Sequence, residues 1–380
     1  MKTLSSTAFI SLLAFTTAAE AIFDNVTVFA PPSNWPSHRT SYGRTLLLDH
    51  TKTDPVLLST WSFSPPDGTY LPKYRSTDGG QTWSDFSKVH FSNNGGYVGG
   101  SIWQPFLYEL PRQVGQYPRG TILASGNAIP HDFSSTNIEV YASLDRGFSW
   151  EFVSVVATGG PPNTTNGATP VWEPFISMYE DELTVYYSDQ RDPLHGQKLA
   201  HQSTRDLVHW GPVVNDAAYA NYTLRPGMTT VARIGNGKYL LSYELGNAPD
   251  VPYAVHYRIA DNPLKFDEAT PYLLQSRDGT IPSACPYTVW TPVGGPHGTI
   301  VMSDGTYSEV FINRDNGNPH AWIKVPTGKG VAYSRALTVM PDPSVILFFN
   351  GGLYGENNTT VTAGEWIVPR HQRSARQVAR

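Results

Sequence analysis

The sequence predicts an all-β protein and, within that class, a six-bladed β-propeller. The first observation is composition, because 33 Gly, 31 Pro, 10 Trp and 21 Tyr in 380 residues supply many turns and many aromatics that favour strands. The second is a turn sequence that recurs along the chain, and the third is a series of six groups of alternating apolar runs. No long stretch shows a sustained 3.6-residue apolar period, so long helices are not expected.

The first 21 residues are organised like a secretory signal peptide. Lys2 provides the basic start, residues 8–15 form a short apolar core, and residues 19–21 fit the A-x-A cleavage rule. That core is too short to span a bilayer, so no membrane partner is expected. We therefore expect a secreted, extracellular protein whose mature chain begins at Ile22.

Asn-x-[Ser/Thr] sequons agree with that destination, because such sites are glycosylated in secreted proteins. Two of them overlap, and we expect only one of that pair to be used. The predicted glycosylation sites are Asn25, Asn163, Asn221, Asn357 and Asn358.

Residues 76–83 and 143–150 both fit the pattern S-x-D-x-G-x-[ST]-W, and a weaker copy begins at Ser203. In a tight hairpin, Gly tolerates the positive φ of the turn, Asp and Ser satisfy its backbone N–H groups, and Trp fills the neighbouring apolar layer. The motif resembles the Asp-box of sialidase-like propellers. Its recurrence roughly every 60 residues indicates one unit repeated around an axis. We expect Asp78 and Asp145 to lie at outer-rim turns and to stabilise the fold.

The alternating apolar runs form six groups that are bounded by Gly, Pro, Asn and Asp. We expect the blades at about residues 40–92, 97–157, 168–214, 227–277, 284–326 and 330–368. The expected inner strands cover residues 45–48, 120–124, 175–178, 229–233, 287–290 and 336–339.

Residues 23–29 are also strand-like, and a propeller closes when such a terminal strand joins the last blade. We therefore expect one catalytic domain over residues 22–370, followed by a basic tail at 371–380. Two packed β-sandwiches are the structural alternative, but they would not explain the regularly spaced turn motifs.

Charge and cysteine content exclude several classes of function. The net charge is −5 with both signs mixed along the chain, which argues against nucleic acid as a partner. Cys285 is the single cysteine, so no internal disulfide can form, and a buried position is expected. No Cys/His group has the spacing of zinc ligands, and we expect no metal, no other cofactor and a monomer.

Two glutamates stand among apolar residues, where an unpaired carboxylate is costly. Glu173 lies in residues 171–175 (VWEPF), and Glu244 lies in residues 240–246 (LLSYELG). A glycosidase needs one carboxyl group to protonate the leaving oxygen and a second to attack or to activate water. For Glu173, the local sequence is equally compatible with a buried acid paired to an arginine, whereas Glu244 has no base beside it.

Polar and aromatic residues in neighbouring segments are candidates for binding a sugar. Each Trp among them also fits the core. The predicted substrate-binding residues are Arg44, Gln104, Trp172, Gln190, Arg191, Arg225, Tyr287, Trp290 and Arg335.

An ordered set of segments is similar to the fungal exo-α-1,5-L-arabinanases of glycoside hydrolase family 93. The similarity covers about residues 40–350 and is carried by residues 171–175, 185–192, 195–199, 210–214, 225–228, 237–239, 290–292 and 333–335. It implies a propeller that releases arabinobiose from the non-reducing end of linear arabinan with retention of configuration.

The resemblance also implies the catalytic residues. It maps the family's pair onto Glu173 as acid/base and Glu244 as nucleophile, with Tyr333 in a supporting role. Arabinofuranose carries no carboxylate, so a charged nucleophile is not repelled, in contrast to the tyrosine of sialidases. We expect the carboxyl groups about 5–5.5 Å apart, as retention requires. We also expect Glu173 to be the more desolvated and protonated group, and Glu244 to stay ionised beside Tyr333.

Three alternatives remain open at this point. An exo-sialidase would need three arginines around a substrate carboxylate, which Arg44, Arg225, Arg258 and Arg335 are numerous enough to supply. A non-catalytic glycan-binding propeller would keep the aromatics without needing two axial carboxylates. An endo-arabinanase would release longer oligosaccharides first. Residues 159–162 and 247–252 are expected to form a wall that closes one end of an exo-acting cleft.

Overall fold

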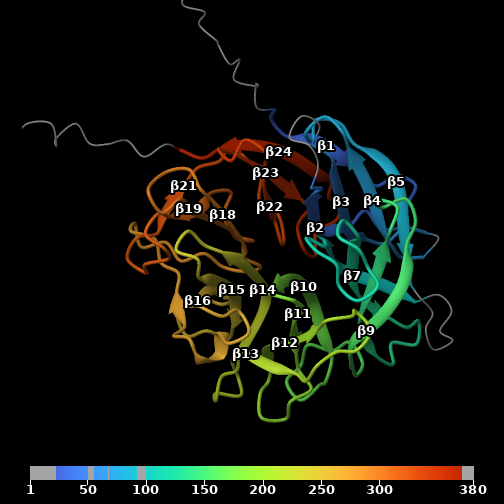
Figure 1. Cartoon of the computed structure of the whole chain (residues 1–380), viewed down its shortest axis with the longest axis horizontal. Coiled ribbons are helices and arrows are strands. Elements are labelled where there is room, and N and C mark those ends of the chain that lie inside the picture. Colours follow the sequence, from blue (N-terminus) through green and yellow to red (C-terminus); the bar gives the residue numbers. More distant parts are fainter. Residues whose placement is uncertain (1–22, 50–54, 67, 92–99, 370–380) are drawn as a thin grey trace, which may run out of the picture.

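The computed structural model describes residues 23–49, 55–66, 68–91 and 100–369. Within these ranges the chain forms six four-stranded antiparallel sheets and one short 3-10 helix, η1 (Phe266–Glu268). The sheets surround a common centre (Figure 1), which confirms the predicted six-bladed propeller. The predicted signal peptide and the predicted basic tail lie outside the described residues.

Blades 1 to 3 each take four consecutive strands. Blade 1 consists of β2 (Thr40–Leu47), β3 (Leu57–Phe63), β4 (Tyr70–Ser76) and β5 (Ser84–His90). Blade 2 consists of β6 (Ser101–Glu109), β7 (Ile122–Ile129), β8 (Thr136–Ser143) and β9 (Glu151–Gly159). Blade 3 consists of β10 (Val171–Tyr179), β11 (Glu182–Asp189), β12 (Lys198–Thr204) and β13 (Val214–Ala217).

Blades 4 and 5 repeat this order, and blade 6 combines both ends of the described chain. Blade 4 consists of β14 (Arg225–Arg233), β15 (Tyr239–Gly246), β16 (Ala254–Ala260) and β17 (Tyr272–Leu273). Blade 5 consists of β18 (Tyr287–Thr291), β19 (Thr299–Ser303), β20 (Val310–Asn313) and β21 (Ile323–Val325). Blade 6 consists of β22 (Ala336–Val339), β23 (Val345–Asn350), β24 (Val361–Ile367) and β1 (Val26–Phe29).

The N-terminal strand closes the ring, as the sequence predicts. β1 pairs antiparallel with β24, with Val26 opposite Ala363. The predicted blade limits agree with the observed strands to within a few residues. Pairing the last blade with a strand from the start of the chain joins the two ends of the ring without a disulfide.

The inner strands β2, β6, β10, β14, β18 and β22 contact one another in a closed ring. One predicted inner strand is wrong, because residues 120–124 lead into β7, the second strand of blade 2, and β6 is innermost. β6 contains Pro105, which weakens it as a strand candidate. The pairing of β6 with β7 shifts register between Trp103 and Phe106, and Pro105 lies within this bulge, where a missing N–H is tolerated.

Similar bulges recur near the start of other inner strands. Tyr42, Gln104, Glu173 and Met228 all have positive φ, between 52° and 64°, and each lies within a register shift of its strand. Positive φ is uncommon for residues other than glycine and marks positions that the surrounding structure must hold in place. The bulges therefore repeat one irregular feature around one end of the propeller axis.

The repeated turn motif lies between the third and fourth strands of its blades, which agrees with the outer-rim turns expected for Asp78 and Asp145. Ser76 Oγ accepts the N–H of Gly80 at 2.8 Å, and Asp78 Oδ1 accepts the N–H of Thr82 at 3.0 Å. Blade 5 has a related turn that the pattern does not detect, because Asn313 replaces the serine and Pro319 and His320 replace the final [ST]-W pair. Asn313 Oδ1 accepts the N–H of Gly317 at 3.0 Å.

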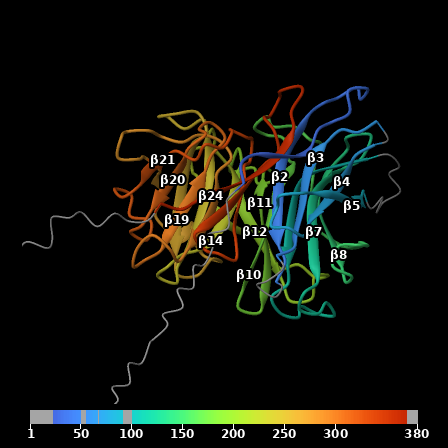
Figure 2. The same cartoon turned by 90° about the horizontal axis from the view of Figure 1, so that it is seen from above.

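The connecting loops gather on two opposite faces of the ring (Figure 2). Apolar side chains fill the space between neighbouring blades, and the main buried cluster includes residues of all six sheets. No helix among the described residues is long and apolar enough to cross a membrane.

Candidate active site

A cavity of about 860 Å³ opens on the face where the inner strands begin. Its floor holds Glu173 and Glu244, the two glutamates that the sequence singles out. Pro162 forms part of the wall, so the loop after blade 2 reaches the cavity as expected. Of the predicted substrate-binding residues, the cavity is lined by Gln104, Trp172 and Arg225, and Tyr333 lines it too.

Glu173 is held by donors from three blades. Its Oε2 accepts the N–H of Met228 at 3.0 Å and the hydroxyl of Ser188 at 3.0 Å. Its Oε1 accepts the phenol of Tyr42 at 3.3 Å. Its own N–H donates to Gln104 Oε1 at 3.1 Å, which fixes the bulge that turns the side chain to the cavity. Glu173 is therefore oriented by a network, not by an arginine partner.

Glu244 has a poorer set of donors. It lies on β15, and its Oε2 accepts the N–H of Cys285 at 2.7 Å. Cys285 is fully buried, as predicted, and its Sγ accepts the N–H of Ser334 at 3.0 Å. Cys285 thus links Glu244 to the start of blade 6.

The pKa values of the two carboxyl groups respond to these surroundings. Burial raises the pKa of Glu173, while the hydrogen bonds from Met228, Ser188 and Tyr42 oppose that rise. Burial and then the nearby charge of Glu173 raise the pKa of Glu244 to about 8, with only the Cys285 N–H opposing. Glu244, which accepts one such hydrogen bond, therefore keeps its proton to a higher pH than an ordinary glutamate, whereas the bonds that stabilise an ionised carboxylate converge on Glu173.

This arrangement of hydrogen-bond donors differs from the one that the sequence led us to expect. Glu173 was expected to be the protonated group and Glu244 the ionised group, but the hydrogen-bond donors converge on Glu173 instead. The phenol of Tyr333 was expected beside Glu244. Burial, and after it the neighbouring Tyr42 and Glu244, raise the pKa of the Tyr333 phenol well above its usual range, so the phenol does lie near Glu244. Its ring also packs edge-on against Tyr42, with 5.1 Å between centroids.

A second polar group supports the cavity wall. Arg225 donates to Gln190 Oε1 at 3.0 Å and to Gln197 Oε1 at 2.7 Å. Gln190 Oε1 also accepts the indole N–H of Trp172 at 2.9 Å. Gln190 therefore positions two lining residues without lining the cavity itself, and Gln197 lines it although the sequence did not single it out.

Arg44 and Tyr287, two predicted ligands of the substrate, do not line the cavity. Arg44 is buried, and its Nη1 donates to the carbonyls of Gly43 at 2.8 Å and Ser334 at 2.9 Å. Its guanidinium lies 5.3 Å from the centroid of the Tyr287 ring. Burial lowers the pKa of Arg44. This residue joins the first strands of blades 1 and 6.

Three further predicted ligands also lie outside the cavity lining. Arg191 pairs with Asp189 at 2.8 Å. The indole N–H of Trp290 donates to the carbonyl of His297 at 3.0 Å, within the β18–β19 hairpin. Arg335 is fully buried, and its guanidinium donates to the carbonyls of Ser308, Gly330 and Glu309. All three side chains bond to other groups of the protein and not to a ligand. The residue type alone does not show this difference.

Sequence reasoning did not single out Tyr42 and Ser188, which hold Glu173. The sequence does contain a signal for Tyr42. Residues 103–106 (WQPF) and residues 172–175 (WEPF) share one pattern at equivalent bulges of blades 2 and 3. Tyr42 occupies the corresponding bulge of blade 1. Ser188 lies near the end of β11, among mostly buried residues, and carries no local signal.

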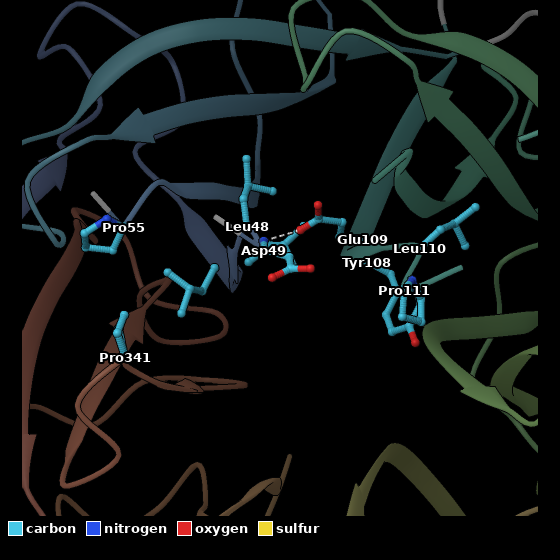
Figure 3. A pocket seen from close by; sticks show the side chains of 10 residues that line it. Leu48, Asp49, Pro55, Tyr108, Glu109, Leu110, Pro111 and Pro341 are labelled. Carbon is cyan, nitrogen blue, oxygen red and sulfur yellow. Dashed lines mark hydrogen bonds between the residues drawn. The ribbon is translucent and has the colours of Figure 1, made fainter. Parts of the chain in front are cut away.

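A second cavity, of about 410 Å³, lies at the opposite ends of the inner strands (Figure 3). Leu46, Leu47 and Leu110 make it mostly apolar. Its two acidic residues already have partners, because Asp49 pairs with Arg119 at the surface and Glu109 Oε2 accepts the N–H of Asp49 at 2.6 Å. It lacks the buried carboxylates that a glycosidase requires. Within the described residues, no group of three or more His, Cys, Asp or Glu is placed to hold a metal ion.

Comparison with solved structures gives close matches to this fold. An α-L-arabinofuranosidase of family GH93 from Fusarium graminearum, in complex with arabinobiose, is 44% identical, with a TM-score of 0.87, over 91% of this chain and 98% of that chain. The chain belongs to glycoside hydrolase family 93. An α-L-arabinanase from Penicillium chrysogenum, also complexed with arabinobiose, is 41% identical over the same shares, with a TM-score of 0.86.

The sialidase-like architecture extends beyond family 93. A sialidase from Streptococcus pneumoniae has a TM-score of 0.60 at 10% identity over 92% of this chain and 71% of that chain, which is a likeness of fold alone. Neither the protein-family models nor the curated proteins give a match.

Proposed function

We propose that this family 93 protein is an exo-acting α-1,5-L-arabinanase that releases arabinobiose from the non-reducing end of linear arabinan. The observation that carries the proposal is the pair of buried glutamates, Glu173 and Glu244, on the floor of one axial cavity. Such a pair serves hydrolysis of a glycosidic bond and has no use in passive binding of a glycan. The arabinobiose complexes of the Fusarium and Penicillium enzymes support this choice of substrate.

The arrangement of arginines disfavours the sialidase alternative. Of the four candidates for binding a substrate carboxylate, Arg225 alone lines the cavity. Arg44 and Arg335 donate to backbone carbonyls, and Arg258 donates to the carbonyls of Phe266, Asp267 and Ala269. A neutral furanoside needs no cluster of arginines, which agrees with this site.

The hydrogen bonds favour an exchange of the catalytic roles that the family resemblance implies. An ionised Glu173, stabilised by three donors, would attack the anomeric carbon as the glycosidic C–O bond breaks. Glu244 would pass its proton to the leaving oxygen. Glu244 would then take a proton from a water molecule that displaces Glu173, which gives net retention. Retention requires about 5–5.5 Å between the carboxyl groups.

Product analysis tests the proposed activity. Purified protein should release arabinobiose from debranched arabinan as the first and dominant product, with the anomeric configuration retained in the NMR spectrum of the fresh product. An early ladder of oligosaccharides would indicate an endo enzyme. Hydrolysis of a sialoside in place of arabinan would favour the sialidase alternative. Slower migration of the protein in a native gel that contains arabinan, without hydrolysis of the arabinan, would indicate a binding protein.

Secretion and N-glycosylation are part of the same proposal. The predicted signal sequence supports export, and all five sequon asparagines are exposed. Asn163 neighbours Pro162 and Thr164 in the cavity wall. Expression in a secreting eukaryotic host, followed by N-terminal sequencing and by treatment with a glycosidase specific for N-glycans, tests both features. Intracellular retention, or an unchanged mass after treatment, would contradict them.

A further inference from the structure

Three tyrosine rings form a continuous column from the catalytic floor to the solvent. Tyr42 is buried, and its phenol donates to Glu173. The Tyr333 ring lies 5.1 Å from Tyr42 on one side and 4.8 Å from Tyr354 on the other. Tyr354 is 69% exposed, and all three rings line the cavity. The column therefore leads outward from the reacting centre.

The outer end of the column is held by backbone contacts. The N–H of Tyr333 donates to the carbonyl of Gly352 at 2.9 Å, two residues before Tyr354. Gly351 packs against Gly43 so closely that a Cβ on Gly351 would lie 2.3 Å from the Gly43 nitrogen. The loop after β23 is thus tied to the starts of blades 1 and 6, and the large exposure of Tyr354 is built into the fold.

Tyr354 presents its exposed ring at the rim of the cavity, where a polymeric substrate would pass into solvent. An exo-acting enzyme encloses the short end of its substrate, while the rest of the polymer must leave the cavity toward solvent. Sugar rings present apolar C–H faces that pack on aromatic side chains. Resting on the proposed function, we infer that Tyr354 is a binding platform for the polymeric, leaving-group side of a linear α-1,5-arabinan chain.

Two other exposed aromatics on the cavity rim serve as comparators. Phe133, after β7, is 54% exposed, and Tyr253, before β16, is 52% exposed. Within the described residues, no other ring packs against either of them, so neither continues an aromatic path to Glu173. Phe148 is 61% exposed, lies in the turn motif of blade 2 and packs on Phe86, away from the cavity.

The test compares a polymeric and a short substrate. Tyr354→Ala should lower kcat/KM on debranched arabinan about fivefold to tenfold, mainly through KM, and change kcat/KM on arabinotriose less than about twofold. Tyr354→Phe keeps the ring and should behave like the parent protein. The measured quantity is the ratio of kcat/KM on debranched arabinan to kcat/KM on arabinotriose. Phe133→Ala and Tyr253→Ala should change this ratio less than Tyr354→Ala does, and Phe148→Ala should leave it unchanged.

Equal losses on both substrates, no loss on the polymer, or a larger effect of Phe133→Ala would overturn the assignment of Tyr354. Retardation in native gels that contain arabinan gives a second readout, because it measures polymer binding without turnover. Tyr354→Ala should migrate faster than the parent protein in such gels, and equal migration would contradict the platform. Failure of the proposed function gives a different result, because the parent protein would then not hydrolyse arabinan at all.

Discussion

Glu173 and Glu244 contact adjacent residues of the same inner strand, β14. Glu173 Oε2 accepts the N–H of Met228 at 3.0 Å, and Glu244 is the register partner of Gly227. A Cβ on Gly227 would lie 3.0 Å from Gln197 Nε2 and 3.6 Å from Glu244 Oε1, so a side chain here would crowd Gln197 in the cavity wall. One bulged strand therefore brings a carboxylate from blade 3 next to a carboxylate from blade 4.

The catalytic roles are tested by removing each carboxylate and adding azide. Glu244→Ala should lose about 10²–10⁴-fold in turnover of arabinan, because no group then protonates the leaving oxygen. A substrate with a good leaving group should still form the glycosyl-enzyme, which azide should trap as the α-arabinosyl azide. Glu173→Ala should give the inverted β-azide.

The configuration of the azide product, read by NMR, decides between the two assignments. An α-azide from Glu173→Ala would restore the roles implied by the family resemblance. Thermal unfolding of both variants serves as the control for folding.

Activity should fall on the alkaline side as Glu244 loses its proton. Its pKa is raised to about 8, so kcat/KM on arabinan should decline above roughly that pH. A substrate that needs no proton on its leaving group should show a much weaker decline. Profiles of kcat/KM against pH for both substrates make the comparison, and identical alkaline limbs would argue against Glu244 as the acid.

Tyr42→Phe should change activity by changing the pKa of Glu173. The variant loses the 3.3 Å hydrogen bond to Glu173 but keeps the ring that packs on Tyr333. Because that bond stabilises the ionised carboxylate, its loss should raise the pKa of Glu173 and move the acid limb of kcat/KM to higher pH. We expect a fall in kcat of roughly tenfold with little change in Tm. An unshifted acid limb would refute this positioning role.

Glu244→Gln should stabilise the protein at alkaline pH. The pKa of this carboxyl rises from an ordinary value of 4.5 to about 8 on folding, so the native state binds more protons than the unfolded state between these values. Stability is therefore lost as pH rises from about 4.5 to 8. An amide does not ionise and can still accept from Cys285, so Tm should exceed that of the parent by a few degrees at pH 8 and match it at pH 4. Equal values at pH 8 would contradict the raised pKa.

Asp78→Ala should lower stability without changing the chemistry. Its carboxylate accepts from the N–H and the hydroxyl of Thr82 and from Ser76, far from the axis. Loss of these bonds should cost about 1–2 kcal/mol in the free energy of unfolding. Asp85→Ala on the neighbouring exposed strand is the matched control, with an expected change under about 0.5 kcal/mol. A stable Asp78→Ala protein without turnover would disprove the structural role.

Much of the architecture could be predicted because its signals are local. Alternating apolar runs mark strands, and the Asp-box turn places its Ser, Asp and Gly within a few residues of one another. The inner strand of blade 2 escaped prediction because Pro105 sits in a bulge, which is a property of the pairing between two strands. Blade 5 carries its turn on Asn313, so a pattern written for serine misses it.

Sequence patterns were enough to predict the fold class, the number of blades and the closing strand, and to select Glu173 and Glu244. The side chains around these glutamates could not be predicted in the same way, because their donors come from blades 1, 3 and 4 and meet at Glu173 only when the ring closes. Arg44 and Arg335 also donate to backbone carbonyls in the closed ring. From residue type alone, both had been expected to bind the substrate. The distribution of the proton between Glu173 and Glu244 also depends on burial and on donors distant in the chain, which no local pattern encodes.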